Sequence, residues 1–336
     1  MASLKTADTF TSATRVLLRG REGAGVSVPP IACGTWAWGD KTWDYDEQKD
    51  MAGIQEVMKT LVEKDIAFLD TAEVYGSGES ERIIGKLTSE LSPDARNKVV
   101  IATKWLPIPV MPWRLMPRGI VGCLKDSLQR LGLESCDLYQ VHAAWTLPYS
   151  HASVAKNLAE CVKLGLAKTV GVSNYSKEQM IAISDLLEKE GVPLASNQIE
   201  YNLLRRLPET TGLIAAAHER GIVPLAYSPL AMGRLTGKYS VANPPSDKRK
   251  FSAIPMEEIE PLLVVMREIA QARDVPVSAV ALNWVLCKGA IPLGGARNGK
   301  QAEQNAQCLG WRLTDDEVQR LEAHSKEGKT NFWQKG

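Results

Sequence analysis

Eight short apolar runs, rich in β-branched residues, alternate along this 336-residue chain with longer stretches that carry apolar residues at three- and four-residue spacing. The runs are typical of buried strands and the stretches of amphipathic helices. This alternation, without a repeat of sequence, favours a parallel (β/α)8 TIM barrel over a solenoid. The expected strands are Pro30–Gly34, Ala67–Asp70, Val99–Thr103, Leu138–Val141, Thr169–Val172, Ala195–Glu200, Ile222–Ala226 and Ala290–Pro292. The expected helices include Met51–Lys64, Ile120–Leu131, Val154–Leu164, Lys177–Lys189, Thr211–Glu219 and Pro261–Ala272.

The length would also suit two domains, but a single barrel with additions accounts for it. Val16–Gly20 and Gly25–Val28 predict a β-hairpin, which would plug the bottom of the barrel. Residues 1–14, rich in Ser, Thr and Ala, are expected to be a flexible tail, with a transit-peptide remnant as the alternative. We therefore expect one catalytic barrel over residues 15–336, with two extended loops after strand tips at residues 105–119 and 229–257. A disordered insertion is the alternative for the second loop.

Composition narrows the classes of function. Lys and Arg number 40 against 39 Asp and Glu, so the net charge is +1 and no basic face for nucleic acid is expected. No apolar run approaches the roughly 18 residues that a bilayer span needs, and the N-terminus lacks the apolar core of a secretory signal. The sequence thus predicts a cytoplasmic protein without a membrane partner, with organelle import as the alternative. The six cysteines are scattered and form no C-x-x-C pair, so neither a metal site nor a disulfide is expected.

Four motifs lie at the ends of these apolar runs: Asp70–Gly76, Ala102–Lys104, Leu138–His142 and Gly171–Asn174. In a parallel barrel all such tips face one side. An acid, a phenol, an amine and an imidazole would then meet in one pocket, which could protonate a carbonyl oxygen while a hydride arrives at carbon. Taken singly, each group also fits a structural role: a helix cap, a loop aromatic, a rim lysine and a core histidine. The four groups are Asp70, Tyr75, Lys104 and His142.

These motifs, in this order, resemble the aldo-keto reductase superfamily. The resemblance covers nearly the whole chain, because Gly34–Trp36, Ser196–Asn202, Tyr227–Leu230, Leu235–Lys238 and Ile291–Asn305 also match. The segments Trp36–Gly39 and Cys308–Leu313 are most similar to the branch that contains plant and fungal pyridoxal reductases.

The resemblance implies a catalytic tetrad for carbonyl reduction. Tyr75 would be the general acid, although a free tyrosine, with a pKa of about 10, is a weak acid near neutral pH. The ammonium of Lys104 would lower that pKa, and Asp70 would keep the ammonium charged and in place. His142 would orient the carbonyl group and share the negative charge that develops on its oxygen.

The resemblance also implies NADPH, although no Rossmann fingerprint is present. Gly20–Gly25 is glycine-rich but opens no helix. An extended cofactor would lie across the barrel mouth, with Tyr227 stacked on the nicotinamide ring and Arg297 facing the ribose 2′-phosphate. A solvated loop arginine is the alternative for Arg297. The family often has Glu where this chain has Gln304, which puts that one contact in doubt.

Sixteen residues are expected at the cofactor. Ser173, Asn174 and Gln198 would bind the carboxamide, Ser228, Leu230 and Lys238 the pyrophosphate, and the segment after the eighth strand the adenosine end, where a helix N-terminus favours phosphate. The full set is Thr35, Trp36, Ser173, Asn174, Gln198, Tyr227, Ser228, Pro229, Leu230, Lys238, Gly295, Ala296, Arg297, Gln301, Gln304 and Asn305.

Tryptophans on the same rim predict an apolar pocket for a planar or bulky aldehyde or ketone. The expected lining is Trp38, Trp105, Trp113 and Trp145. Pyridoxal and a carbonyl compound of secondary metabolism are both candidate substrates. Two alternatives remain open: a cofactor-binding regulatory protein resembling potassium-channel β-subunits, and an alcohol dehydrogenase that runs in the oxidative direction.

Overall fold

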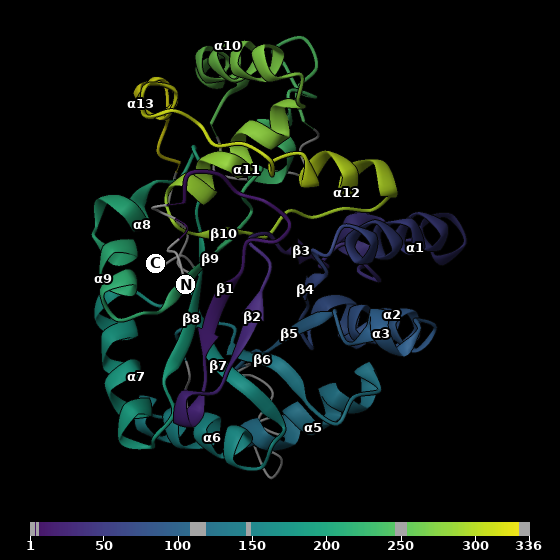
Figure 1. Ribbon diagram of the computed structural model, residues 1–336, viewed down its shortest axis with the longest axis vertical. Helices are drawn as coiled ribbons and strands as arrows, with labels where there is room; N and C mark the ends of the chain where they lie inside the picture. Colours follow the sequence, from purple (N-terminus) through teal and green to yellow (C-terminus); the bar gives the residue numbers. More distant parts are fainter. Residues whose placement is uncertain (1–3, 5–6, 108–118, 146–148, 246–253, 329–336) are drawn as a thin grey trace.

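The computed structural model describes the chain except residues 1–3, 5–6, 108–118, 146–148, 246–253 and 329–336. Within the described residues, eight parallel strands form one sheet in chain order, surrounded by helices (Figure 1). Ala32 bridges Leu293 beyond the outermost strands, with Ala32 N donating to the Pro292 carbonyl at 3.0 Å, and this bridge closes the barrel. The expected (β/α)8 TIM barrel is confirmed. Its strands are β3 (Cys33–Gly34), β4 (Phe68–Asp70), β5 (Val100–Trp105), β6 (Cys136–Val141), β7 (Ala167–Ser173), β8 (Leu194–Glu200), β9 (Val223–Tyr227) and β10 (Ile291–Pro292).

The helices follow the expected order, with differences at their ends. α7 (Lys177–Lys189) has the expected bounds, because Ser176 caps its first turn in a capping box. The helix expected over Thr211–Glu219 begins two residues later, as α9, because Gly212, with φ +78°, separates it from the short α8 that ends at Thr210. The other α-helices are α1 (Glu47–Glu63), α2 (Glu79–Ser89), α3 (Pro93–Arg96), α5 (Gly119–Leu131), α6 (His151–Lys163), α8 (Leu207–Thr210), α9 (Leu213–Glu219), α10 (Met256–Arg273), α11 (Val277–Cys287), α12 (Gly299–Ala306) and α13 (Asp315–Ala323).

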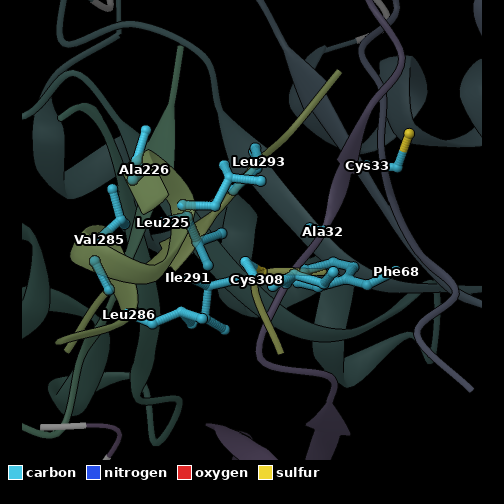
Figure 2. Close-up of a cluster of buried hydrophobic side chains, with 14 of the residues drawn as sticks. Ala32, Cys33, Phe68, Leu225, Ala226, Val285, Leu286, Ile291, Leu293 and Cys308 are labelled. Carbon is cyan, nitrogen blue, oxygen red and sulfur yellow. The ribbon is translucent and has the colours of Figure 1, made fainter. Parts of the chain in front are cut away.

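Helix α11 was not among the expected helices, and its surroundings explain why. Every residue from Ser278 to Cys287 is buried, so the helix has no polar face and its sequence has no 3.6-residue period. Figure 2 shows Val285 and Leu286 of this helix packed with side chains of β9 and β10, including Leu225 and Ile291. This apolar cluster also includes Ala32 and Leu293, so it lies beside the line where the last strand meets the first.

The expected hairpin is present at one end of the barrel. β1 (Val16–Arg19) and β2 (Gly25–Val28) pair antiparallel, with Leu18 and Val28 fully buried. Figure 1 shows the hairpin lying across the barrel. Arg19 donates to the carbonyl of Arg220, which precedes β9, so the hairpin covers the N-terminal ends of the strands and leaves their C-terminal ends open.

Part of the expected N-terminal tail is packed against the barrel. Phe10 is fully buried, its carbonyl accepts from Gly310 N at 2.5 Å, and the Arg312 guanidinium lies 5.1 Å from its ring centroid. Phe10 therefore does not behave as part of a flexible segment, because its ring contributes to the core. Leu4 is buried in the same core, but two isolated apolar side chains in a mostly polar stretch give no periodic signal. The division at residue 15 stays a prediction. In the part of the chain described, no helix combines the length and apolar character that a bilayer span requires.

Candidate active site

The C-terminal ends of β4 and β5 bring a lysine, an aspartate and a tyrosine into direct contact. Lys104 is fully buried, and its Nζ donates to Asp70 Oδ2 at 2.5 Å, to the Thr71 carbonyl at 2.9 Å and to the Tyr75 hydroxyl at 3.4 Å. An ammonium group has three N–H donors, so these three contacts fix its position. The expected contacts between Lys104 and both Asp70 and Tyr75 are therefore present in the structure.

Two glutamine side chains hold the other oxygen of Asp70. Gln198 Nε2 on β8 donates to Asp70 Oδ1 at 2.8 Å, and Gln140 Nε2 on β6 donates to the same oxygen at 3.2 Å. Gln198 was expected at a cofactor carboxamide, but here its amide nitrogen turns toward the carboxylate. Gln140 was not among the expected site residues. A glutamine inside an otherwise apolar strand must find a hydrogen-bond partner when it is buried, and this could have indicated its role.

His142 lies directly beyond β6 and faces Tyr75. The two rings meet edge to face, with centroids 5.7 Å apart and an angle of 80° between the planes. Removal of the imidazole from water, together with the charge of Lys104, holds the pKa of His142 well below its usual range. Within the described residues no group hydrogen-bonds its buried Nδ1. His142 is therefore a neutral imidazole with one N–H to donate.

The pKa of Tyr75 moves in the opposite direction to the expected one. Removal from water raises the pKa of the phenol, and the carboxylates of Asp70 and Asp40 add to this effect, while Lys104 lowers it. The net direction is upward, because removal of the phenol from water outweighs the effect of the Lys104 ammonium. Burial lowers the pKa of Lys104, but Asp70 and Tyr75 raise it by more, so the amine keeps its proton. The site thus holds a protonated phenol beside a charged ammonium.

An exposed tryptophan covers the phenol. The Trp36 ring stacks on Tyr75, with centroids 6.0 Å apart and planes at 25°, and 39% of Trp36 remains exposed. Its Nε1 donates to Asp40 Oδ2 at 2.9 Å, and Trp43 packs edge-on against it at 5.3 Å. Asp40 also accepts from Gly76 N at 3.3 Å, so it ties the loop of Trp36 to the loop of the tyrosine. Trp36 was expected at the cofactor, but it offers its free face beside the tetrad.

The tips of β7, β8 and β9 form a second polar group next to His142. Asn174 Nδ2 donates to the His142 carbonyl and to Ser173 Oγ, both at 3.2 Å, and Asn174 Oδ1 accepts from the Tyr227 hydroxyl at 2.8 Å. Ser173 Oγ in turn donates to the Gln198 carbonyl at 2.9 Å. The four residues expected at the carboxamide and the nicotinamide ring are thus joined by hydrogen bonds at the mouth of the barrel.

The loop after β9 has an unusual backbone. Ser228, Ala231 and Met232 have φ of 49°, 46° and 52°, a region that side chains other than glycine rarely adopt. Asn202 Nδ2 holds the Ser228 carbonyl at 3.0 Å. Strain of this kind gathers at functional sites, where the surrounding structure maintains it. The expected pyrophosphate residues Ser228 and Leu230 lie in this strained segment, with Pro229 between them, and Lys238 is exposed just beyond it.

The segment after β10 is fastened to both neighbouring loops. Asn298 caps α12 by accepting from Gln301 N at 3.0 Å, and Asn305 Nδ2 donates to the Gly295 carbonyl at 3.2 Å. Trp38 Nε1 donates to the Ala296 carbonyl at 2.8 Å. Gln304 is half-buried on α12. Thr35, also expected at the cofactor, is fully buried, and its hydroxyl donates to the carbonyl of Asp70 at 3.0 Å.

Arg297 is neither free nor solvated. Its Nη2 donates to both carboxylate oxygens of Asp50 at 3.0 Å, and its Nη1 donates to the Trp43 carbonyl at 3.1 Å. About a third of the Arg297 side chain and less than a fifth of that of Asp50 reach solvent, at 30% and 18%. The arginine expected at a 2′-phosphate is therefore in an ion pair with the first turn of α1.

Comparisons with known proteins show the family of this chain. The profile of the Aldo/keto reductase family matches residues 30–326. The chain belongs to this family. The chloroplastic pyridoxal reductase of Arabidopsis thaliana is 37% identical to this aldo/keto reductase over 320 residues, which cover 92% of this chain and 86% of the relative.

Solved structures agree with the fold of this aldo/keto reductase. A glycerol dehydrogenase from Gluconobacter oxydans superposes with a TM-score of 0.75 at 28% identity, covering 92% of this chain and 94% of that one. An aldo-keto reductase from Klebsiella pneumoniae, crystallised with NADPH, superposes with a TM-score of 0.69 at 22% identity, covering 95% and 98%. As a member of its family, the protein is an oxidoreductase.

Two tryptophans expected in the substrate pocket of this aldo/keto reductase are packing residues. Trp105 is 1% exposed, and its ring lies edge-on to Tyr149 at 5.8 Å. Successive side chains of a strand point to opposite sides, so with Lys104 inside the barrel Trp105 faces the helix layer. Trp38 is likewise fully enclosed. Trp145 is half-buried, with its Nε1 donating to the Pro107 carbonyl at 2.9 Å, and Trp113 lies outside the described residues.

Proposed function

We propose that this protein reduces an aldehyde or ketone to the alcohol with NADPH, and that Tyr75 supplies the proton. The single observation that carries the proposal is the buried Lys104 ammonium, which donates to Asp70 and to the Tyr75 hydroxyl at once. Such a contact serves a phenol that must become a phenolate during the reaction, because the adjacent positive charge stabilises the negative oxygen. When bound, NADPH supplies the hydride.

The residues at the barrel mouth fit such a cofactor. Tyr227 offers a half-buried ring beside the amide of Asn174, which suits a nicotinamide and its carboxamide. At the other end, a capped helix N-terminus and Arg297 are groups that favour phosphate. NADPH in the Klebsiella pneumoniae structure supports the same choice. We assign Ser173, Asn174 and Tyr227 to the nicotinamide end, and Gly295, Arg297, Gln301 and Asn305 to the adenosine end.

The tetrad divides the work on the carbonyl group. The Tyr75 hydroxyl gives its proton to the carbonyl oxygen, and the ammonium of Lys104 stabilises the phenolate that is left. Asp70 keeps the amine charged, while Gln140 and Gln198 hold the carboxylate in place. The neutral His142 donates a hydrogen bond to the same carbonyl oxygen and orients it. These groups are set before the reaction begins, so little reorganisation opposes the transfer.

The exposed face of Trp36 supports an aromatic carbonyl substrate. It lies over Tyr75 and is the large aromatic surface beside the proposed acid. A planar ring stacked there would bring its carbonyl group near the phenol. Pyridoxal, an aromatic aldehyde, meets this description, and the Arabidopsis relative is named a pyridoxal reductase. We propose pyridoxal or a similar planar aldehyde as the substrate. The expected cytoplasmic location stays a prediction.

Turnover of reduced cofactor tests the proposal. NADPH oxidation is followed with pyridoxal, a panel of aromatic aldehydes and ketones, and aliphatic carbonyls of similar size. Tyr75→Phe is the test variant, because it removes only the hydroxyl and keeps the ring. It should slow reduction by about 10²–10⁴-fold, with the affinity for NADPH unchanged. More than about a tenth of the wild-type rate in this variant would exclude Tyr75 as the acid. The reverse reaction with NADP⁺ and the product alcohol measures the preferred direction.

A further inference from the structure

The ion pair between Arg297 and Asp50 has an unusual geometry. Both carboxylate oxygens of Asp50 are bonded to the same nitrogen, Nη2, at 3.0 Å each. The strong arrangement of arginine with a carboxylate instead uses two nitrogens in parallel. The contact is thus weaker than a two-nitrogen pair, although both side chains are largely sheltered from water.

Asp50 is held in place independently of the arginine. Its Oδ2 accepts from Asp46 N at 2.9 Å, within the first turn of α1. That helix end also carries Glu47, and Asp46 Oδ1 caps it by accepting from Gln48 N. The carboxylate is therefore a fixed negative charge in contact with Arg297, the cation assigned to the cofactor phosphate.

We propose that Asp50 is a specificity-determining residue that competes with the 2′-phosphate of NADPH for Arg297. This inference rests on the proposed function, in which Arg297 faces that phosphate. A phosphate that binds the guanidinium must replace or share the Asp50 contact, and it also meets the repulsion of a nearby carboxylate. Asp50 thus weakens NADPH binding and leaves NADH binding nearly unchanged, because NADH has no 2′-phosphate. It sets the ratio between the two affinities.

The consequence for turnover is faster cofactor exchange. A ligand whose anchoring cation is shared with a protein carboxylate dissociates sooner than one with sole use of it, and differences in affinity between related complexes fall mostly on the dissociation rate. Release of product is often the slow step of an enzyme. Asp50 therefore favours rapid release of NADP⁺ over tight binding.

Fluorescence titration of NADPH and NADH with the full chain tests this inference without a substrate. Asp50→Asn keeps the side-chain shape and removes the charge, so the dissociation constant for NADPH should fall about three- to tenfold, with that for NADH changed by less than twofold. Glu47→Gln is the matched control, because it removes the same charge from an exposed position on the same helix turn. It should leave both constants unchanged. In an Arg297→Ala background the gain from Asp50→Asn should largely disappear.

Two outcomes would overturn the inference. Unchanged or weaker NADPH binding in Asp50→Asn would mean that the carboxylate has no effect or positions the arginine for the phosphate. Equal tightening by Glu47→Gln would mean that general charge explains the effect. Arg297→Ala alone tests the underlying assignment: if it weakens NADPH and NADH equally, or neither, the proposed adenosine end is wrong. If it weakens NADPH selectively while Asp50→Asn has no effect, only the inference fails.

Discussion

Lys104 Nζ and Asp70 Oδ2 lie 2.5 Å apart at the centre of the barrel, and both side chains are almost completely shielded from solvent. An ammonium and a carboxylate in such a place are costly to desolvate, and each depends on the other. Three further side chains of the site contact this pair. The tyrosine lies on its outer side, and two glutamines support it from neighbouring strands.

The buried pair gives a prediction about stability. Asp70→Asn leaves the Lys104 charge buried without a carboxylate, so the free energy of unfolding should fall by about 3–5 kcal/mol. Adding Lys104→Met removes that charge and should restore part of the loss. Glu190→Gln breaks the half-exposed pair with Lys163 and should cost no more than about 1 kcal/mol. Urea unfolding of the variants at one pH measures these differences. A double variant no more stable than Asp70→Asn alone would contradict the explanation.

In the proposed mechanism, the titration of Tyr75 and His142 sets the pH dependence of reduction. Tyr75 must carry its proton, and because its pKa is raised, the rate should fall only as the pH rises above the usual tyrosine value of about 10. The pKa of His142 is well below its usual range, so the rate should not change as the pH passes from about 6 to 8. The pH profile of kcat with saturating NADPH checks both expectations. A step near pH 6.5 would show that His142 titrates in the normal range and is charged below it.

Glu200 predicts a pH dependence of stability that is separate from catalysis. Its pKa is raised from 4.5 to about 8, because burial and the nearby Glu327 outweigh the attraction of Arg205, whose Nε lies 3.7 Å away. The folded protein then holds a proton that the unfolded chain releases between pH 4.5 and about 8. The contribution of Glu200 to the free energy of unfolding is therefore greatest below pH 4.5. It falls as the pH rises toward 8, by at most about 1.4 kcal/mol per pH unit.

Glu200→Gln isolates this effect, since glutamine mimics the protonated form. Urea unfolding of wild type and variant between pH 5 and 9 should give a difference in stability that shifts toward the variant as the pH rises. Parallel curves for the two proteins would mean that Glu200 is ionised throughout, paired with Arg205.

Replacing an exposed tryptophan and replacing a buried one should have different effects. Trp36→Ala removes the exposed ring over Tyr75 and should raise KM for aromatic carbonyls more than for aliphatic ones, with little change in stability. Trp38→Ala empties a fully enclosed site, so it should cost about 3–5 kcal/mol of stability through the cavity left behind. Steady-state kinetics on a matched substrate pair and thermal unfolding measure the two effects. If Trp36→Ala keeps the wild-type preference between aromatic and aliphatic carbonyls, Trp36 does not contact the substrate.

The sequence placed Asp70, Tyr75 and Lys104 close together, because parallel strands have their C-terminal ends on one side, and these contacts are present. Their catalytic roles stay a prediction. Asp70 and Lys104 follow from that rule alone. The direction of Trp105 could also have been predicted, since it follows a lysine that must face the barrel axis. Strand alternation then sends the tryptophan toward the helices. Proximity to a strand tip was therefore too coarse a criterion for the substrate pocket.

Other features depend on contacts that no local pattern reveals. The partner of Arg297 is 247 positions away on α1. Gln140 and Gln198 meet Asp70 only after three strands have curved around one axis. The net direction of the Tyr75 pKa depends on how far burial outweighs one ammonium, which is a question of geometry rather than of residue type. The motifs therefore indicated which titratable groups meet, whereas packing determines their partners and the direction of their pKa shifts.

Closure of the barrel has a consequence for how the cofactor site comes into being. Among the described residues, Ala32 and Leu293 form the bridge between the first and last strands, and Trp38 reaches Ala296 across the same seam, 258 positions away. The proposed adenosine end of the site therefore forms only once these two segments, which are far apart in the chain, have come together. A ligand bound there also ties the ends together, by mass action. Binding of the proposed cofactor should therefore add to the stability of the closed barrel.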